Sequence, residues 1–453
     1  MNIALIRKYN VPGPRYTSYP TVPYGDKTGI DLSDWEQAVY NTYQKEKSYG
    51  ISLYIHLPFC ESLCTFCACH KHITKRHEVE DPYISAVIKE WKLYLQVIQE
   101  KPLLKEIHLG GGTPTFFSPD ALSHLINTIK ADCTVTTDHE FSFEGHPNNT
   151  TKEHLQALYD VGFRRVSFGV QDYDPRVQLA INRIQPFEHV VQVHNWSKDI
   201  GYTSISHDLV YGLPYQTLEG MLETIELTNT LRPDRLAFYS YAHVPWIKGV
   251  GSRGFDENDL PSNEAKRELY EEGKAALERN GYEEIGMDHF ALKSDHLYTH
   301  FNEGKLHRNF MGYTTNNTRL MIGLGMSSIS DSWTAFAQNV KTVKEYQELI
   351  EQGIIPIFRG HKLNKEDLYI RKHILEIMCH FKTKWRKDEE NASYFEAINT
   401  RLEPFFQDDL IQQKEDWLIV NEAGKLFVRN ICMAFDLKLN RAKPTTRLFS
   451  QTI

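Results

Sequence analysis

Short apolar runs alternate with amphipathic stretches through the first half of the chain. The runs end in polar residues or glycine and recur at intervals of roughly 30–40 residues, which is the length of a strand–helix unit. They lie at residues 51–59, 105–114, 140–147, 164–172, 204–214 and 235–245. The pattern predicts an α/β fold in which parallel strands and helices form a partial or complete barrel.

The stretches between these runs carry helix signals. Ser118, followed by proline, predicts an N-cap, and Thr217 predicts another. Thr150 and Glu153 form a capping-box pattern, and Gly162 ends the helix that they begin. We therefore expect each strand to be followed by a helix.

Two further regions flank the expected barrel domain, which spans residues 46–360. Residues 361–453 predict a small α-rich domain that resembles a winged helix but shows no basic recognition face, so we expect no nucleic-acid partner. Residues 1–45 are too short to fold alone, and we expect this N-terminal segment to cover the active site.

Composition limits the class of protein. The chain has 453 residues, 41% of them hydrophobic, which is enough for one large domain and a smaller one. We find no apolar leader in the first residues and no apolar run of about 18 residues that could span a membrane. The net charge of −8 argues against a general polyanion binder, and we expect a cytoplasmic protein.

Cysteine spacing brings in the chemistry. Four of the seven cysteines lie in "PFCESLCTFCACHK", residues 58–71, with the spacing C-x3-C-x2-C-x-C. A redox disulfide needs an isolated pair, and a structural zinc ion usually takes two pairs from separate turns. Closely spaced thiols on a loop after a strand favour an iron–sulfur cluster. If three of them bind a cubane cluster, one iron stays open for a substrate.

Polar residues at the strand ends form a second candidate group. Glu144, Gln171 and Asp208 end successive runs, and glycines occupy positions 110–112. The carboxyl ends of parallel strands meet at one face of a barrel, where active sites lie. Each of these residues alone could be a structural cap, but their recurrence at equivalent strand ends favours a site.

The cysteine motif resembles the signature of radical S-adenosylmethionine enzymes, C-x3-C-x2-C with an aromatic residue before the third cysteine. Here these residues are Cys60, Cys64, Phe66 and Cys67. The resemblance implies a partial (β/α)6 barrel with the cluster loop after its first strand. "GGGTP" at residues 110–114 also matches that superfamily, in which it approaches the amino group of S-adenosylmethionine.

Further motifs narrow the resemblance to one family. "GPRYTSYPT", "YIHLPFC", the extra Cys69, "GVQD", "DLVYGLP" and "RNICMAFD" together are similar to the oxygen-independent coproporphyrinogen III oxidases. The resemblance implies that two propionates of coproporphyrinogen III are decarboxylated to vinyl groups in haem synthesis. It also implies a [4Fe–4S] cluster, two molecules of S-adenosylmethionine, a low-potential electron donor that the sequence does not identify, and a monomer.

The same resemblance assigns roles to residues. Cys60, Cys64 and Cys67 would bind the cluster, and Tyr54, Glu144 and Cys69 are candidate catalytic residues. The first S-adenosylmethionine would contact Tyr54, Gly111, Glu144 and Ile329. The second would contact Phe66, Gly112, Thr113, Gln171, Arg183, Asp208 and Ala242.

Substrate contacts and departures from the family pattern complete these expectations. Arg15 and Arg308 are candidates for the substrate carboxylates, with structural ion pairs as the alternative. Arg15, Tyr16 and Tyr19 are expected to close over the barrel mouth, or the tyrosines only patch its open end. The departures are Ala68, His146 and Met311.

Two other functions stay open from the sequence. One is a haem-binding chaperone, although such relatives typically lack both Cys69 and the "PRYTSYP" segment, which this chain has. The other is a haem-opening radical methyltransferase, which keeps the cluster and changes the substrate.

Overall fold

The computed structural model describes residues 3–24, 29–245, 254–442 and 449–452. Its main feature is a twelve-stranded sheet whose central strands are parallel and follow one another in chain order. These strands are β1 (Ile51–Leu57), β4 (Leu103–Gly111), β5 (Thr134–Gly145), β6 (Arg165–Gln171), β7 (Ser204–Tyr211) and β8 (Arg235–Ser240). The predicted partial (β/α)6 barrel is confirmed, and in the described residues the sheet does not close on itself.

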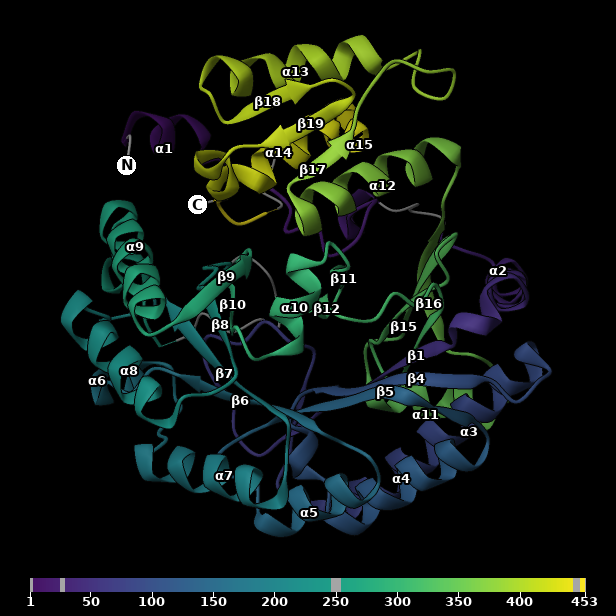
Figure 1. The fold of residues 1–453 in the computed structure, drawn as a ribbon. Coiled ribbons are helices and arrows are strands. Elements are labelled where there is room, and N and C mark those ends of the chain that lie inside the picture. Colours follow the sequence, from purple (N-terminus) through teal and green to yellow (C-terminus); the bar gives the residue numbers. More distant parts are fainter. Residues whose placement is uncertain (1–2, 25–28, 246–253, 443–448, 453) are drawn as a thin grey trace.

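Helices cover the outer face of these strands (Figure 1). They are α3 (Glu80–Ile98), α4 (Pro119–Ala131), α5 (Lys152–Asp160), α6 (Pro175–Ala180), α7 (Phe187–Ile200), α8 (Leu218–Leu231) and α9 (Asn263–Arg279). Ser118 and Thr217 cap α4 and α8 as predicted. The predicted capping box at Thr150 and Glu153 is wrong by one residue, because Thr151 caps α5.

The sheet extends beyond the six predicted strands at both edges. At one edge β13 (Met321–Leu324) runs parallel to β1, and β14 (Ile329–Asp331), β15 (Ala335–Asn339) and β16 (Ile357–Lys362) follow antiparallel. At the other edge lie β10 (His289–Leu292) and β9 (Tyr282–Gly286). The remaining elements are β2 (Phe59–Cys60), β3 (His72–Ile73), α10 (His296–Asn302), α11 (Val343–Glu351) and the hairpin of β11 (His307–Asn309) and β12 (Gly312–Thr314).

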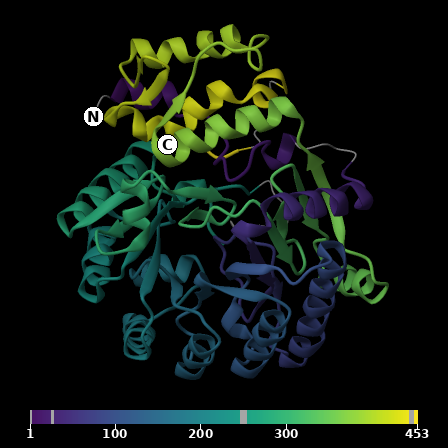
Figure 2. The ribbon, with the colours of Figure 1, turned by 45° about the vertical axis from the view of Figure 1, so that its right-hand side comes forward.

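The C-terminal domain packs on the side of the barrel away from α4, α5 and α7 (Figures 1 and 2). It contains α12 (Lys365–His380), β17 (Lys382–Lys384), α13 (Phe395–Gln407), β18 (Ile411–Lys414), β19 (Trp417–Val420), α14 (Val428–Phe435) and α15 (Leu437–Ala442). Its strands form a three-stranded antiparallel sheet in the order β17-β19-β18. The domain is therefore mixed, because a three-stranded sheet accompanies the helices that the sequence predicts.

The N-terminal segment is divided between the two domains. Helix α1 (Ile3–Tyr9) and the residues after it pack on the C-terminal domain, whereas α2 (Leu32–Glu46) packs on the barrel. Tyr16 and Tyr19 are each 2% exposed in the core of the C-terminal domain, and the Tyr16 hydroxyl donates to Asp436 at 3.1 Å. The two tyrosine rings therefore do not lie over the barrel mouth, whereas the covering of the active site by this segment stays a prediction.

Arg429 joins both ends of the described chain to the C-terminal domain. Its guanidinium donates to the carbonyls of Gly13 and Pro14 on one side and of Gln451 and Thr452 on the other. The two chain segments that Arg429 holds also form a β-bridge between residues 12 and 451. Separately, no helix in the described part of the chain is long and apolar enough to cross a membrane.

Candidate active site

The cysteine loop opens a cavity of about 180 Å³ at the carboxyl ends of the barrel strands. The loop leaves β1, pairs briefly through β2 and β3, and returns to the barrel wall at α3. Most of the predicted site residues line this one cavity. They are Cys60, Cys64, Phe66, Cys67, Cys69, Gly111, Gly112, Thr113, Glu144, Gln171, Arg183 and Asp208.

The thiols have polar partners around them. Cys60 Sγ lies 3.3 Å from Thr113 Oγ1, and Arg183 Nη1 donates to Cys64 Sγ at 3.7 Å. A hydrogen bond with Cys69 lowers the pKa of Cys67 to about 6 in spite of burial, and the charges of Lys71 and Arg183 act in the same direction. The thiolate is the form that binds iron, so this environment favours ligation.

The donor set fits an iron–sulfur cluster better than a single ion. Among the described residues, no three Cys, His, Asp or Glu side chains are placed to hold one metal ion, as a zinc site would require. A [4Fe–4S] cluster offers a separate iron atom to each thiolate, so its ligands stand farther apart. Cys60, Cys64 and Cys67 on one cavity wall suit that arrangement.

Two glycines let the backbone approach the cysteine loop closely. Gly111 has a φ of +119°, a conformation that other residues rarely adopt. A Cβ at Gly112 would lie 2.4 Å from the carbonyl oxygen of Pro58. Any side chain at position 112 would therefore push the loop away, which explains why the glycine run follows this strand.

Charged groups at the strand ends are only partly neutralised. Asp208 accepts a hydrogen bond from Ser167 at 2.9 Å, yet burial raises the pKa of its carboxyl to about 7. Arg183 donates to the carbonyl oxygen of Gly169 at 2.6 Å, but its buried Nε has no partner among the described residues. An acid and a cation with spare hydrogen-bonding capacity suit a ligand with hydroxyl and carboxylate groups.

Tyr54 lies beside the cavity within a group of rings that sequence reasoning missed in part. Its hydroxyl is 3.0 Å from Nδ1 of His56, and its ring centroid is 4.8 Å from that of Phe310. His108 lies 3.3 Å from the Glu144 carboxylate and stacks on Tyr54. His56 and His108 sit inside the strands β1 and β4, and their alternation with apolar neighbours is the signal that could have found them.

Besides Tyr54, four predicted residues lie outside the lining of this cavity. Ile329 begins β14. Its carbonyl oxygen would lie 2.5 Å from a Cβ placed on Gly323, and Gly323 is the residue opposite Tyr54 in the sheet. Ala242 follows β8 and is partly exposed. Arg15 forms an ion pair with Asp288 at 2.9 Å, the structural alternative stated for it.

Arg308 is a buried cation with spare donors. It is 4% exposed, and within the described ranges its Nε and Nη1 have no hydrogen-bond partner. Its Nη2 donates to the carbonyl of Arg15 at 3.4 Å, and the guanidinium lies 4.5 Å from the centroid of the Tyr313 ring. Such a group retains the capacity to bind an anion.

The departures from the family pattern fall in different places. His146 lines the cavity, where burial and the charge of Arg183 lower its pKa well below the ordinary value, and it accepts a hydrogen bond from the backbone of Asn148. Met311 occupies the turn of the β11–β12 hairpin. Ala68 is exposed in the cysteine loop.

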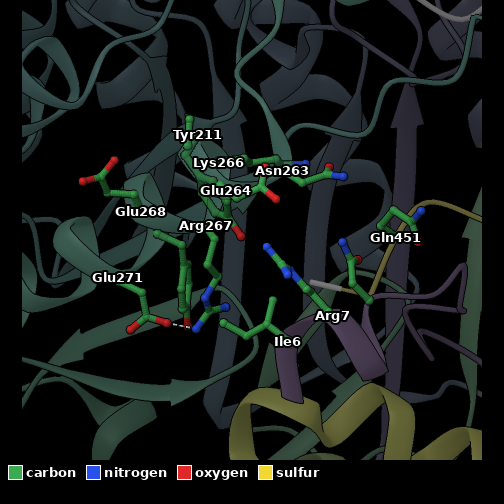
Figure 3. Close-up of a pocket in the computed structure, with 13 residues that line it drawn as sticks. Ile6, Arg7, Tyr211, Asn263, Glu264, Lys266, Arg267, Glu268, Glu271 and Gln451 are labelled. Carbon is green, nitrogen blue, oxygen red and sulfur yellow. Dashed lines mark ion pairs between the residues drawn. The ribbon is translucent and has the colours of Figure 1, made fainter. Parts of the chain in front are cut away.

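A larger cavity of about 730 Å³ lies between α1 and α9 and shares no lining residue with the cysteine cavity. Figure 3 shows charged side chains of both signs around it, including the ion pair of Arg267 with Glu271. Its lining contains three basic and three acidic residues, so it carries no excess charge that would select an anionic ligand. The chemistry is therefore placed at the smaller cavity.

Comparisons with known proteins match this arrangement. Residues 54–228 match the family model of the radical SAM superfamily. The chain is 40% identical to the oxygen-independent coproporphyrinogen III oxidase of Helicobacter pylori strain J99 over 98% of both chains. It is 36% identical to the enzyme of that name from Escherichia coli K12 over 100% of this chain and 98% of the relative. The solved coproporphyrinogen III oxidase of Escherichia coli, described as a radical SAM enzyme, superimposes with a TM-score of 0.89, covering 96% of this chain and 98% of that one.

Proposed function

Because the chain belongs to the family of oxygen-independent coproporphyrinogen III oxidases, we propose that it oxidatively decarboxylates two propionates of coproporphyrinogen III to vinyl groups. The product is protoporphyrinogen IX, a precursor of haem. The observation that carries this proposal is the single cavity that joins three thiols, the glycine run and the strand-end acids. It is the arrangement that a radical S-adenosylmethionine oxidoreductase requires.

Cys60, Cys64 and Cys67 hold the [4Fe–4S] cluster, and Cys69 stays unligated and tunes Cys67 through their hydrogen bond. When bound, the cluster and S-adenosylmethionine would supply the radical chemistry for taking a hydrogen atom from a propionate. The propionate then loses carbon dioxide, and the surplus electron passes to an acceptor. The protein binds and orients the reactants and keeps water and oxygen out.

The strand-end residues orient two molecules of S-adenosylmethionine. Glu144 and Asp208 accept hydrogen bonds from amino or hydroxyl groups, and Arg183 donates to a carboxylate. The first molecule lies against Tyr54, Gly111, Glu144 and Ile329. The second lies against Phe66, Gly112, Thr113, Gln171, Arg183, Asp208 and Ala242.

Arg308 binds a propionate of the tetrapyrrole. The proposal is supported by its burial and by the two donors that lack a partner. Arg15 has a weaker claim, since Asp288 already neutralises it. A low-potential donor supplies the electrons, and the enzyme works as a monomer. All seven cysteines are free thiols, which supports a reducing, cytoplasmic location.

An anaerobic assay tests this function. The protein with a reconstituted cluster receives S-adenosylmethionine, dithionite and coproporphyrinogen III, and the products are separated by chromatography. We expect protoporphyrinogen IX together with 5′-deoxyadenosine and carbon dioxide. Tight haem binding without decarboxylation would instead favour the chaperone, and consumption of haem with transfer of a methyl group would favour the methyltransferase.

A further inference from the structure

A basic surface with exposed apolar side chains lies next to the cysteine loop. We name it the cluster-side patch and define it by His70, Lys71, Ile73, Lys341, Phe358 and Arg359. The patch is a local exception on a chain with a net charge of −8. Four of these residues lie beyond the cysteine loop, and none of the four lines the cysteine cavity. They are Ile73, Lys341, Phe358 and Arg359.

The strand directions place Lys341, Phe358 and Arg359 at the end of the sheet where the cysteine loop begins. Strand β13 runs parallel to β1, and β14, β15 and β16 each run antiparallel to the strand before them. The carboxyl end of β15 and the amino end of β16 therefore lie on the same side of the sheet as the carboxyl end of β1. Lys341 follows β15, and Phe358 and Arg359 are among the first residues of β16.

Lys71 and Ile73 of the patch contact the backbone of the cysteine loop. In the β2–β3 ladder Ile73 pairs with Cys60, and Ile73 is 42% exposed. Lys71 Nζ donates to the carbonyl oxygens of Cys67 and Cys69 at 3.1 and 3.2 Å. A protein that touches these two side chains is thus one residue away from the cluster ligands.

The cations at the ends of β15 and β16 affect an ionisable side chain of the cysteine loop. Burial, and then the charges of Lys341, Arg359 and Lys71, lower the pKa of His70. Lys341 Nζ lies 5.4 Å from the centroid of the Phe358 ring, and Arg359 Cζ lies 5.9 Å from it. Phe358 is 55% exposed, so a large apolar ring stands among uncompensated cations.

Two carboxylates, one from the cysteine loop and one from α11 between β15 and β16, have partners outside the patch. Glu351, on α11, is 2.5 Å from Lys89, and Glu61 lies toward His77 at 3.8 Å. Within the described ranges neither Lys341 nor Arg359 forms an ion pair, and Arg359 Nε donates only to the neutral amide of Gln338. The patch therefore presents a net positive charge to a partner.

We propose that the cluster-side patch is the docking surface for an acidic, low-potential electron-carrier protein. The proposal rests on the proposed function, because radical S-adenosylmethionine chemistry needs an external electron for each cofactor cleavage. One electron leaves the reduced carrier, which is oxidised by one electron, and enters the cluster held by Cys60, Cys64 and Cys67. Small, transient electron-transfer interfaces use a charged rim around a modest apolar contact, which is what Phe358 and Ile73 offer.

Charge reversal tests the docking surface. In the loaded, full-length protein we would compare wild type with Lys341→Glu/Arg359→Glu, and use Lys365→Glu/Lys414→Glu, on the C-terminal domain, as a control with the same net charge. The probes are a bacterial flavodoxin and an acidic ferredoxin. Binding is measured at low and high salt, and 5′-deoxyadenosine formation is measured with each reduced probe and with dithionite.

We expect the patch variant to bind the probes at least tenfold more weakly at low salt, with a difference that shrinks at high salt because charge steering is screened. Turnover with the protein donors should fall by a similar factor, and turnover with dithionite should stay at the wild-type level. Phe358→Ser should weaken binding at both salt concentrations.

Equal losses with dithionite and with the carriers, or a raised KM for coproporphyrinogen III with dithionite, would overturn the proposal in favour of a substrate or folding effect. Unchanged binding of both carriers would also overturn it. If no decarboxylation occurs in wild type with any reductant, the proposed function fails, while the binding measurement still decides whether the patch docks a carrier.

Discussion

Charged side chains at the two ends of the barrel strands differ in burial and in pairing. At the amino ends, Arg235 and Asp295 pair at 2.7 Å with side chains that are 6% and 2% exposed, and Ser204 donates to the same aspartate. At the carboxyl ends, the Glu144 side chain is 48% exposed, and its carboxylate lies 3.3 Å from His108. Paired charges hold the barrel together at one end, whereas unpaired ones await ligands at the other.

The amino-end arrangement extends across the barrel floor. Glu106 accepts hydrogen bonds from Ser52 and Thr314 at 2.8 and 3.2 Å, and Glu140 is bound by Arg165 and Thr315. The difference teaches that burial of charge alone does not mark an active site. What marks it is a charge whose partners are missing, because a ligand can then supply them.

The largest expected effect comes from removing a thiol at the carboxyl end. Cys67→Ala should lose the visible absorbance of the cluster and all turnover, because three thiolates are needed. The free energy of unfolding of the cluster-free protein should change by less than about 0.5 kcal/mol, since the residue is not core. Iron content, absorbance and urea unfolding check this.

Two matched variants control that experiment. Cys133→Ala removes a buried thiol outside the site and should keep the cluster. Cys69→Ala should keep the cluster and slow turnover. An iron-free Cys69→Ala protein would contradict the three-ligand assignment and indicate a fourth thiolate ligand.

The next effect comes from breaking the charge pair at the amino end. Arg235→Met leaves Asp295 buried without its cation, and we expect a loss of about 3–5 kcal/mol in the free energy of unfolding. Arg235→Met/Asp295→Leu should recover much of this loss, since no unpaired charge remains. Urea unfolding of the three proteins measures it, and a loss below about 1 kcal/mol for the single variant would speak against the comparison.

The smallest effect concerns Asp208 and pH. Its carboxyl has a pKa of about 7 in the folded protein, above the ordinary value of 3.8, so the folded state binds the proton more tightly than the unfolded state. Wild-type stability attributable to this group therefore falls as pH rises from about 4 to about 7. Asp208→Asn removes this dependence, and its Tm relative to wild type should rise between pH 5 and pH 8 by roughly 2–4 °C.

Thermal scans without ligand measure this shift, and Asp199→Asn, which makes the same change of charge at an exposed position, serves as the control. Addition of S-adenosylmethionine should raise the Tm of wild type more than that of Asp208→Asn. A pH-independent difference would mean that Asp208 is ionised in the fold like a surface carboxylate.

The sequence predicts those parts of the molecule that depend on neighbours along the chain. Each apolar run pairs with the next, so the parallel order and the caps at Ser118 and Thr217 could be read directly. The cysteine cavity follows because its residues sit at the ends of these runs. His56 and His108 were missed because a polar residue inside a strand looks like a structural one.

The rest depends on partners that are far apart in sequence. Strand β13 pairs with β1 across about 270 residues, since Met321 lies opposite Ser52, and no local pattern encodes that choice. Tyr16 reaches Asp436 across 420 residues, so its burial in the C-terminal domain was not readable from "GPRYTSYPT". Long-range pairing is the physical reason for both errors.

The hydrogen bonds from Arg429 to both ends of the described chain have a consequence for the order in which the parts of the protein fold. The segment around Gly13 and Pro14 is synthesised before the arginine that holds it, which follows 415 residues after Pro14. At about 5–20 residues per second this interval is roughly 20–80 s. Throughout that time the barrel can fold while the tyrosines of the first segment have no core to enter. The segment around Gly13 and Pro14 therefore reaches its native place only after Arg429 and the C-terminal domain have been made.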